Sequence, residues 1–198
     1  MNPADLQKRL GGSLPGIAAW RNMAPGKRAF PIDIDDYRDA SVLVALFPKE
    51  GEWRLPLIVR TDDGGIHARQ VALPGGALLE DETIEGAALR EAHEEVGLPP
   101  GIVTLLGRLS TLPIPVSRFR VTPVIGTLAI EPEWKLSEQE VESLFTVSLN
   151  ALSDESRWRS EERQFGEQTV TIPYLALGGK KVWGATAMVL AEIAALLE

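Results

Sequence analysis

The chain has 198 residues, of which 44% are hydrophobic and 24% charged, as in a globular protein. One domain of this size buries about 70% of its unfolded surface, whereas the formal net charge of −8 provides no overall positive field for a nucleic-acid backbone or an anionic membrane. Zero cysteines exclude disulfides, thiolate nucleophiles and cysteine-based zinc sites, which fits a reducing cytoplasm.

The first 36 residues are expected to form an arm on a single domain whose core spans residues 37–198. A short helix is predicted at residues 5–10, and "GGSLPGIAAWRNMAPGKRAFP" after it is interrupted by Gly and Pro. The amino terminus lacks the apolar core of a signal peptide, and the longest apolar run, "ASVLVALF", is too short to span a bilayer. We therefore expect a soluble, cytoplasmic protein.

Several runs rich in β-forming residues follow the arm. "ASVLVALF" and "LPLIV" are predicted strands, and "TDDGGI" has the Asp and Gly of a hairpin turn that leads into "HARQVAL". Further strands are expected at "IVTLLGRL", "FRVTPVIGTLAI", "SLFTVSL" and "QTVTIPYLAL". The charged stretch "SDESRWRSEERQFGEQ" predicts a solvated loop or hairpin before the last of these strands.

Two longer helices are predicted among these strands. Residues 81–96 have helical spacing on their apolar side, and "GLPPG" ends them with a capping Gly followed by prolines. "WGATAMVLAEIAALLE" predicts an amphipathic closing helix. Strands that outnumber helices in this order indicate an α+β protein, an α/β/α sandwich with a mixed sheet between helices.

The first of these helices carries an acidic cluster. Glu91, Glu94 and Glu95 lie within five positions in "LREAHEEVGL", so they converge on one patch where like charges repel. Such oxygen donors suit Mg²⁺ or Mn²⁺. Taken alone, the triplet is more often a solvated acidic face, on which Arg90 pairs with Glu94.

The wider spacing reverses that preference. Residues 76–98, "GALLEDETIEGAALREAHEEVGL", place Gly76, Glu82, Arg90 and the three glutamates at the intervals of the complete Nudix box. The chain therefore resembles a Nudix hydrolase. The resemblance implies hydrolysis of a nucleoside diphosphate linked to another group, on the Nudix fold.

The resemblance also implies residue roles. The three box glutamates would be metal ligands, with the Gly75 carbonyl as an additional candidate, and Arg90 would pair with Glu82 to orient the helix. Metal ions would neutralise the diphosphate and activate a water molecule. Either a box glutamate or Glu140 could accept the proton of that water, and Glu140 is equally well read as an ordinary surface acid.

The segment before the box resembles the signature of the coenzyme A diphosphatase branch of the family. That signature reads Arg-Ser, two residues, Leu-Arg, one residue, His, one residue, Gly-Gln-Val, one residue, Phe-Pro-Gly-Gly. Seven positions of "RTDDGGIHARQVALPGG" are in register: Arg60, His67, Gln70, Val71, Pro74, Gly75 and Gly76. The segments "YRDASVLVALF", "VTPVIGTL", "EQEVESLFTVSLNAL" and "VWGATA" extend the resemblance from about residue 37 to the carboxyl terminus.

The window also departs from the signature. Thr61 replaces Ser and Leu73 replaces Phe, whereas Gly64 and Gly65 stand at Leu-Arg and Arg69 stands at Gly. Coenzyme A carries a 3′-phosphate, which an arginine fork would bind. Arg69 shares a face with position 65, and could replace its missing Arg, only if the strand is regular.

Four residues of the window are candidates for substrate binding: Arg60, His67, Arg69 and Gln70. A structural hydrogen-bonding role for His67 is an equal alternative, and His93 is expected to be exposed. Trp53, Trp134, Trp158 and Trp183 could each stack on an adenine, although partly buried packing is the commoner role of tryptophan.

Three functions agree with these residues. The first is metal-dependent cleavage of coenzyme A or its thioesters to 3′,5′-ADP and 4′-phosphopantetheine or its acylated form. The second is the same chemistry on ADP-ribose, a dinucleotide or a nucleoside triphosphate. The third is a Nudix module that binds a nucleotide without cleaving it, against which the intact box argues. In each case the partner is a small nucleotide, not a nucleic acid or a membrane, and the oligomeric state is left open, with a homodimer among the alternatives.

Overall fold

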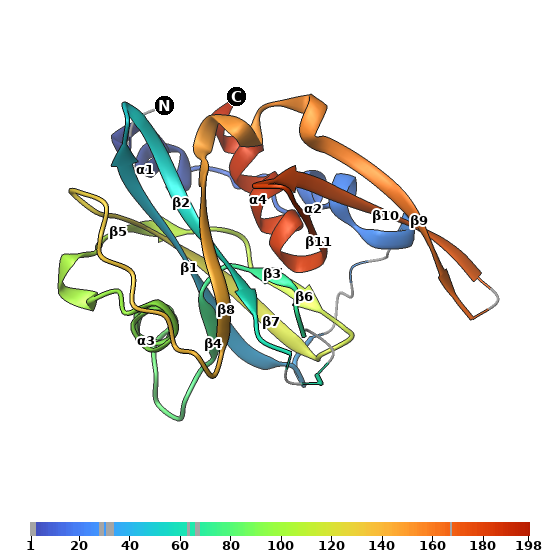
Figure 1. The fold of residues 1–198 in the computed structure, drawn as a ribbon, viewed down its shortest axis with the longest axis horizontal. Coiled ribbons are helices and arrows are strands. Elements are labelled where there is room, and N and C mark those ends of the chain that lie inside the picture. Colours follow the sequence, from blue (N-terminus) through green and yellow to red (C-terminus); the bar gives the residue numbers. More distant parts are fainter. Residues whose placement is uncertain (1–2, 28–29, 31–33, 63, 66–67, 167) are drawn as a thin grey trace.

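The computed structural model describes residues 3–27, 30, 34–62, 64–65, 68–166 and 168–198 (Figure 1). These residues form an eight-stranded sheet and a separate three-stranded sheet. Within the same ranges, no helix is both long enough and apolar enough to cross a membrane.

Parallel and antiparallel pairs occur together in the main sheet, whose strand order is β3-β2-β1-β7-β5. β1 (Arg38–Lys49) and β7 (Phe119–Thr127) run parallel at its centre, and the other pairs are antiparallel. β4 pairs with β1, β6 with β7 and β8 with β2. The remaining strands are β2 (Glu52–Arg60), β3 (Val71–Ala72), β4 (Gly75–Ala77), β5 (Thr104–Arg108), β6 (Leu112–Ile114) and β8 (Val141–Ser148). The predicted mixed sheet is confirmed.

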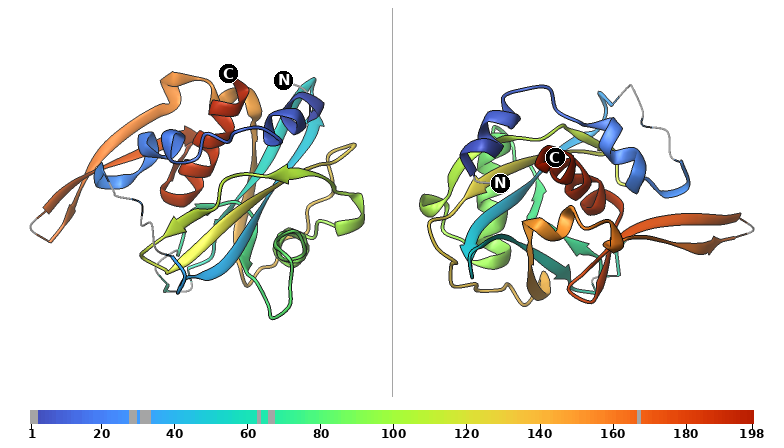
Figure 2. Two further views of the ribbon diagram at one scale, coloured as in Figure 1. Left: turned by 180° about the vertical axis from the view of Figure 1, so that it is seen from behind. Right: turned by 90° about the horizontal axis from the view of Figure 1, so that it is seen from above.

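Alternate residues of β1 show why the sheet lies between two helical layers. Val44 and Leu46 belong to one buried cluster, whereas Leu43, Ala45 and Phe47 belong to another. Successive side chains of a strand point to opposite faces, so β1 supplies both cores. α3 covers one face and α4 covers the other (Figures 1 and 2).

α3 (Ile84–Val96) ends at Gly97 as its sequence predicts but begins at Ile84 and not at residue 81. The side chain of Thr83 accepts a hydrogen bond from the backbone of Gly86, and Gly97 ends the helix in the left-handed region with φ 69°. Ala88, Ala92 and Val96 are buried in the cluster on the β1 side. The opposite stripe of this helix is therefore free to carry polar groups.

α4 (Gly184–Leu197) differs from the prediction of an amphipathic helix. Its residues from Ala187 to Ala194 are all buried. The amino-terminal arm explains this burial, because α1 (Pro3–Leu10), α2 (Ile17–Trp20) and the 3-10 turn η1 (Arg21–Met23) pack against α4. The arm thus covers the side of α4 that faces away from the sheet (Figure 2).

One buried carboxylate joins the arm to α4. Glu192 is fully buried, and its Oε1 accepts hydrogen bonds from Gly16 N (3.2 Å), Ser110 N (3.1 Å) and Ser110 Oγ (2.6 Å). Its Oε2 accepts one from Trp20 Nε1 at 2.9 Å. Four donors from two distant segments therefore satisfy a side chain that the helical pattern assigned no role.

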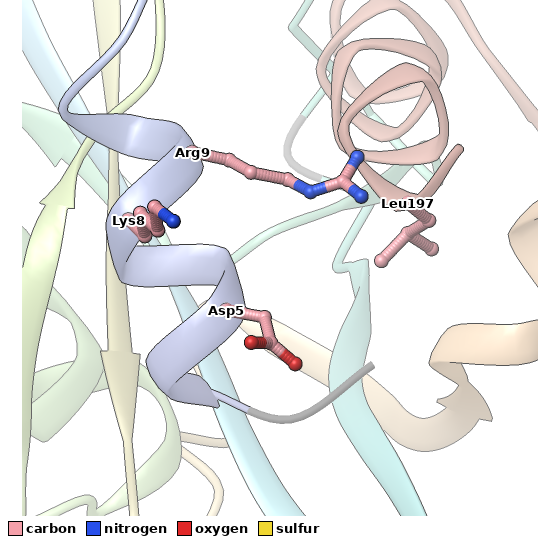
Figure 3. Close-up of a pocket in the computed structure, with 4 residues that line it drawn as sticks. All are labelled: Asp5, Lys8, Arg9 and Leu197. Atoms are coloured by element: carbon pink, nitrogen blue, oxygen red, sulfur yellow. The ribbon is translucent and has the colours of Figure 1, made fainter.

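Near the end of the same helix, α1 supplies a second polar contact. Arg9 Nη1 donates to the carbonyl of Leu196 at 2.9 Å, beside a hollow of about 570 Å³ lined by Asp5, Lys8, Arg9 and Leu197 (Figure 3). An arginine at this position interacts favourably with the carboxyl end of a helix.

The charged stretch before the last predicted strand forms a hairpin, one of the two predicted outcomes. β9 (Trp158–Phe165) pairs with β10 (Gln168–Leu177), which also pairs with β11 (Lys180–Trp183). Figure 2 shows this hairpin projecting from the rest of the molecule. The remaining 3-10 turns are η2 (Pro25–Lys27), η3 (Pro100–Ile102), η4 (Leu149–Leu152) and η5 (Glu155–Arg157).

The predicted hairpin through "TDDGGI" is confirmed in that β2 and β3 pair antiparallel, but its second strand is shorter than predicted, since β3 holds only Val71 and Ala72. Ala68 N donates to the carbonyl of Gly65, and Arg69 has φ 57°, which interrupts an extended strand. The short strands β4, β6 and β11 were not predicted, because three or four residues are too few to show a period.

Candidate functional site

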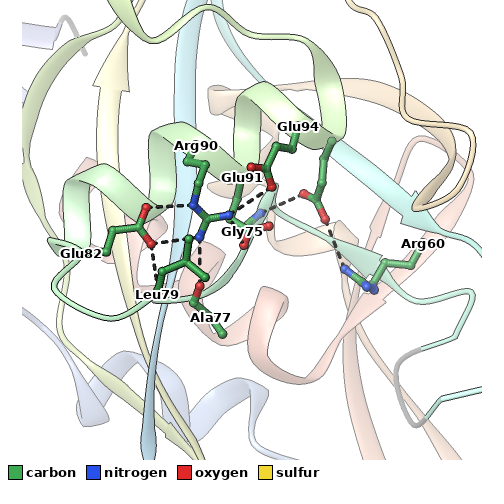
Figure 4. A network of polar contacts seen from close by, with 9 residues as sticks. Arg60, Gly75, Ala77, Leu79, Glu82, Arg90, Glu91 and Glu94 are labelled. Atoms are coloured by element: carbon green, nitrogen blue, oxygen red, sulfur yellow. Dashed lines mark hydrogen bonds and ion pairs between the residues drawn. The ribbon is translucent and has the colours of Figure 1, made fainter.

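A single arginine ties the amino-terminal half of the acidic helix to the loop before it (Figure 4). Arg90 Nε and Nη2 bind the two oxygens of Glu82 at 2.8 and 3.0 Å, and Nη2 also donates to the carbonyl of Ala77 at 3.1 Å. The backbone of Leu79 donates to Glu82 at 3.0 Å. The hydrogen bonds from Arg90 hold the pKa of Glu82 below its ordinary value. The expected pair of Arg90 and Glu82 is therefore present in the structure.

The same guanidinium gathers two of the three box glutamates. Arg90 Nη1 lies 2.8 Å from Glu91 Oε1 and 3.1 Å from Glu94 Oε2. Hydrogen bonds to Glu82 and Glu91 raise the pKa of Arg90 well above its ordinary value. The ion pair of Arg90 with Glu94, expected for a solvated acidic face, is therefore present, and Arg90 binds Glu82 at the same time.

Glu95 is directed away from this arginine. Its side chain is 1% exposed, its Oε2 accepts from Gly75 N at 2.9 Å, and its Oε1 lies 3.3 Å from Arg60 Nη1. Burial raises the pKa of Glu95 to about 7, although the Gly75 hydrogen bond and the charge of Arg60 oppose the rise. The expected convergence on one patch therefore holds for Glu91 and Glu94, while Glu95 is engaged by β2 and β4.

Two glycines bring the backbone of β4 close to these side chains. A Cβ at Gly76 would lie 2.5 Å from the carboxyl group of Glu91, and one at Gly75 would lie 2.3 Å from the carbonyl oxygen of Ser41. Any larger residue would displace either the carboxylate or the strand pairing. The two glycines of β4 are thus required by close approach.

The donor set fits a divalent cation in its chemistry. Searching the described part of the chain finds no group of three or more His, Cys, Asp or Glu side chains close enough together to hold a metal ion. However, Glu91 and Glu94 already converge on one cationic nitrogen, and all the candidate side-chain ligands are the hard oxygens that Mg²⁺ and Mn²⁺ prefer. A metal ion would take the place of an arginine contact.

The loop between β2 and β3 holds the candidate substrate residues. Arg60 contacts Glu95, and its backbone N donates to the carbonyl of Gln70 at 3.0 Å. Arg69 is 71% exposed and its Nε lies 3.0 Å from Asp62 Oδ2. Gly65, Ala68 and Arg69 lie outside any strand, and Arg69 has φ 57°, so the regular strand that would let Arg69 replace an arginine at 65 is not found in the described residues of this loop. His67 lies outside the described residues.

Glu140 lies in the loop that precedes β8. The backbone of Ser137 in this loop donates to the carbonyl of Glu95 at 2.9 Å, and Thr61 N donates to the carbonyl of Glu140 at 3.1 Å. The exposed carboxyl of Glu140 lies near enough to Glu95 for its charge to contribute to the raised pKa of Glu95. The loop thus brings Glu140 to the site.

The remaining candidates lie in ordinary surroundings. His93 is exposed. Four tryptophans are half-buried: Trp53, Trp134, Trp158 and Trp183. Trp134 packs edge-on against Phe47 with ring centroids 5.7 Å apart, and Trp158 Nε1 donates to the carbonyl of Leu152 at 3.0 Å. These contacts are those of packed side chains.

Sequence comparisons agree with this geometry. Residues 37–168 match the NUDIX domain family. A protein of Enterobacter sp. (strain 638) described as "Uncharacterized Nudix hydrolase NudL" is 35% identical over 165 residues, covering 82% of this chain and 84% of that protein. "Nudix hydrolase 15, mitochondrial" of Arabidopsis thaliana is 36% identical over 166 residues, and the aligned region covers 79% of this chain and 58% of the plant protein.

Solved structures share the fold. A MutT/nudix family protein from Enterococcus faecalis has a TM-score of 0.52 at 17% identity, covering 98% of this chain and 73% of that one. A Nudix hydrolase from M. Smegmatis, RenU, has a TM-score of 0.51 at 27% identity, covering 60% of this chain and 74% of that one. The mixed sheet and its helices therefore have close counterparts among known folds.

Proposed function

The chain belongs to the Nudix family and is a diphosphatase, and on that premise we propose that it cleaves coenzyme A or an acyl-coenzyme A. The products are 3′,5′-ADP and 4′-phosphopantetheine or its acylated form. The proposal rests on one observation: the segment that resembles the coenzyme A branch, residues 60–76, contacts the carboxylate of Glu95 from both of its ends. Arg60 contacts Glu95 at 3.3 Å and Gly75 N donates to it at 2.9 Å.

Nudix hydrolases generally use divalent metal ions. We assign Glu91, Glu94, Glu95 and the Gly75 carbonyl as the residues that would hold Mg²⁺ or Mn²⁺. When bound, the metal would neutralise phosphate oxygens and lower the pKa of a water molecule. The contacts of Arg90 with Glu82 and with Ala77 keep the helix and the β4 loop in a fixed relation. Arg90 is in this respect a positioning residue.

Glu140 is the candidate that would accept the proton of the attacking water. A carboxylate bound to a metal is a weaker base than one in water, which favours a residue outside the ligand set. The carboxyl group of Glu140 is exposed and its loop is hydrogen-bonded to the end of α3. Glu140→Gln should lower kcat by about 10²- to 10⁴-fold, whereas Glu138→Gln, at an exposed position of the same loop, should keep wild-type kcat. Equal kcat values for the two variants would transfer the role to a box glutamate.

The substrate is tested by product analysis. Coenzyme A, ADP-ribose, NADH and nucleoside triphosphates are offered separately with Mg²⁺ or Mn²⁺, and products are identified by liquid chromatography and mass spectrometry. Release of 3′,5′-ADP with a kcat/KM at least tenfold above the others, about 1.4 kcal/mol, supports the proposal. Glu94→Gln should abolish the turnover, while Glu155→Gln, at an exposed position of η5, serves as the control.

A second candidate substrate follows from the altered window. Arg69 is held by Asp62, and Gly64 and Gly65 offer no side chain for a 3′-phosphate. This arrangement favours a diphosphate without that group, such as ADP-ribose or NADH. Equal kcat/KM for coenzyme A and its 3′-dephospho form would support this alternative. Failure to hydrolyse any of these diphosphates would favour a binding module.

A further inference from the structure

A hollow of about 430 Å³ lies beside the glutamate helix, between the start of β1 and the loop from β4 to α3. Its walls include Tyr37 and Asp39 on one side and Leu79, Glu80 and Glu82 on the other. The volume lies within the range of small-ligand sites, which is about 300 to 1,000 Å³. No role has been given above to any of these residues except Glu82.

The hollow continues the strand pair that carries the diphosphate site. Gly75 lies opposite Val42 and Ala77 lies opposite Ala40, and Leu78 N then donates to the carbonyl of Asp39 at 3.1 Å. Three residues of extended chain from Gly75 to the hollow span about 10 Å. That span matches the sugar that separates a diphosphate from its base.

One hydrogen-bond network connects the hollow to the catalytic carboxylates. Glu82 forms part of the wall and binds Arg90, which also binds Glu91 and Glu94. Figure 4 shows Glu82 and Leu79 at one end of this network and Arg60 at the other. A ligand that extends along the network from the glutamates therefore meets the hollow on the side opposite Arg60.

The wall selects for the charge and shape of the ligand. The lining holds three carboxylates, Asp39, Glu80 and Glu82, and one cation, Arg38, whose guanidinium lies over the ring of Phe119 at 4.4 Å, so its negative excess disfavours a phosphate group. The ring of half-buried Tyr37 and the side chain of Leu79, whose residue is 61% exposed, supply flat and apolar surface. A neutral heterocycle that donates hydrogen bonds suits this lining, since an ionised carboxylate only accepts them.

We propose that this hollow is the subsite for the adenine base of the substrate, with Glu80 as the residue that recognises the exocyclic amine. Asp39 is already bound by Arg120 at 2.5 and 2.9 Å and Glu82 by Arg90, while Glu80 takes part in no ion pair found in the described ranges. The inference rests on the proposed function in taking the substrate to be a nucleoside diphosphate. It adds that the adenine base of the substrate lies at the Glu82 end of the hydrogen-bond network.

Binding of AMP and IMP to the metal-free protein, measured by calorimetry, tests the subsite without turnover. IMP carries an oxygen in place of the amine, so the wild type should bind AMP at least tenfold more tightly. Glu80→Gln can donate to that oxygen and should reduce the preference to below threefold. Tyr37→Ala should weaken both ligands, and Glu133→Gln, exposed and distant from the hollow, should behave as wild type.

The same comparison is then made on KM with NADH and its hypoxanthine analogue. Equal affinity of the wild type for AMP and IMP, or an unchanged preference in Glu80→Gln, would overturn the subsite even if coenzyme A is hydrolysed. A preference that Glu80→Gln removes, in a protein that cleaves none of the offered diphosphates, would support the subsite and reject the proposed function.

Discussion

Removing the carboxylate of Glu192 should strongly destabilise the protein. Of its four donors, the Ser110 hydroxyl can rotate, but Gly16 N, Trp20 Nε1 and Ser110 N are fixed and would lose their acceptor in a region where Glu192 itself is fully buried. Each buried donor left unsatisfied loses about 1–3 kcal/mol. Glu192→Ala should therefore lower the free energy of unfolding by about 3–9 kcal/mol, a large part of the ~5–15 kcal/mol typical of a domain.

Glu192→Gln separates the lost contact from the lost side chain. The amide keeps one oxygen for Gly16 and Ser110 but turns its NH₂ group toward Trp20 Nε1, which is also a donor. One broken hydrogen bond with a buried donor predicts a loss of about 1–3 kcal/mol. The order of stability should be wild type, then Glu192→Gln, then Glu192→Ala.

Equilibrium urea unfolding measures these differences, with Glu198→Ala at the exposed end of the same helix as the control. Limited proteolysis should also cut the arm faster in Glu192→Ala, because the arm loses its buried anchor. The reasoning would be refuted by a Glu192→Ala variant within about 0.5 kcal/mol of wild type, the range of ordinary surface substitutions.

Three further outcomes concern the glutamate site. In the metal-free protein the pKa of Glu95 is about 7, against an ordinary value of 4.5, so ionisation of Glu95 disfavours the folded state. The free energy of unfolding should therefore be highest below pH 4.5 and fall by about 3 kcal/mol as the pH rises through 7. Urea unfolding at pH 5 and pH 8 should show this loss in wild type and not in Glu95→Gln, and Mg²⁺ should remove it. In Gly76→Ala the new Cβ would lie 2.5 Å from the carboxyl group of Glu91 and force it away. Steady-state kinetics should show kcat reduced more than tenfold, while urea unfolding should show a free energy of unfolding lower by only about 1–3 kcal/mol. A wild-type kcat would contradict the close approach. Arg90→Lys loses the two-oxygen contact with Glu82 and should lower stability by about 2 kcal/mol, and a double-mutant cycle with Glu82→Gln that finds no coupling would contradict this.

Much of the glutamate helix α3 follows from local sequence. Thr83 and Gly97 delimit it through contacts within a few residues, and the spacing of Ala88, Ala92 and Val96 orients it on the sheet. The pair of Arg90 and Glu82 is also local, eight positions apart. Such features are decided by helical geometry, so the apolar spacing and the end at Gly97 were predicted from the residues and the Arg90–Glu82 pair from the resemblance, whereas the Thr83 cap was not predicted.

Other features involve residues far apart in the chain. Arg60 and Gly75 both reach Glu95 because β2 and β4 lie beside the carboxyl half of α3. Neither the sequence of these strands nor that of the helix predicts these contacts by itself. Residues 61–70 have the composition of a hairpin turn and do join two antiparallel strands, yet the left-handed backbone at Arg69 keeps the second strand to Val71 and Ala72. Tertiary packing therefore determines the contacts of Glu95 and the length of β3.

The burial of α4 shows the same division. Its sequence by itself determines a helix with one glutamate among apolar residues, which describes a surface helix as well as a covered one. Only the tertiary structure brings Gly16, Trp20 and Ser110 to Glu192 and so makes its burial tolerable. The local sequence pattern shows that a buried Glu192 would need hydrogen-bond donors. The donors come from segments up to 176 positions away, and only the folded chain brings them to its carboxylate.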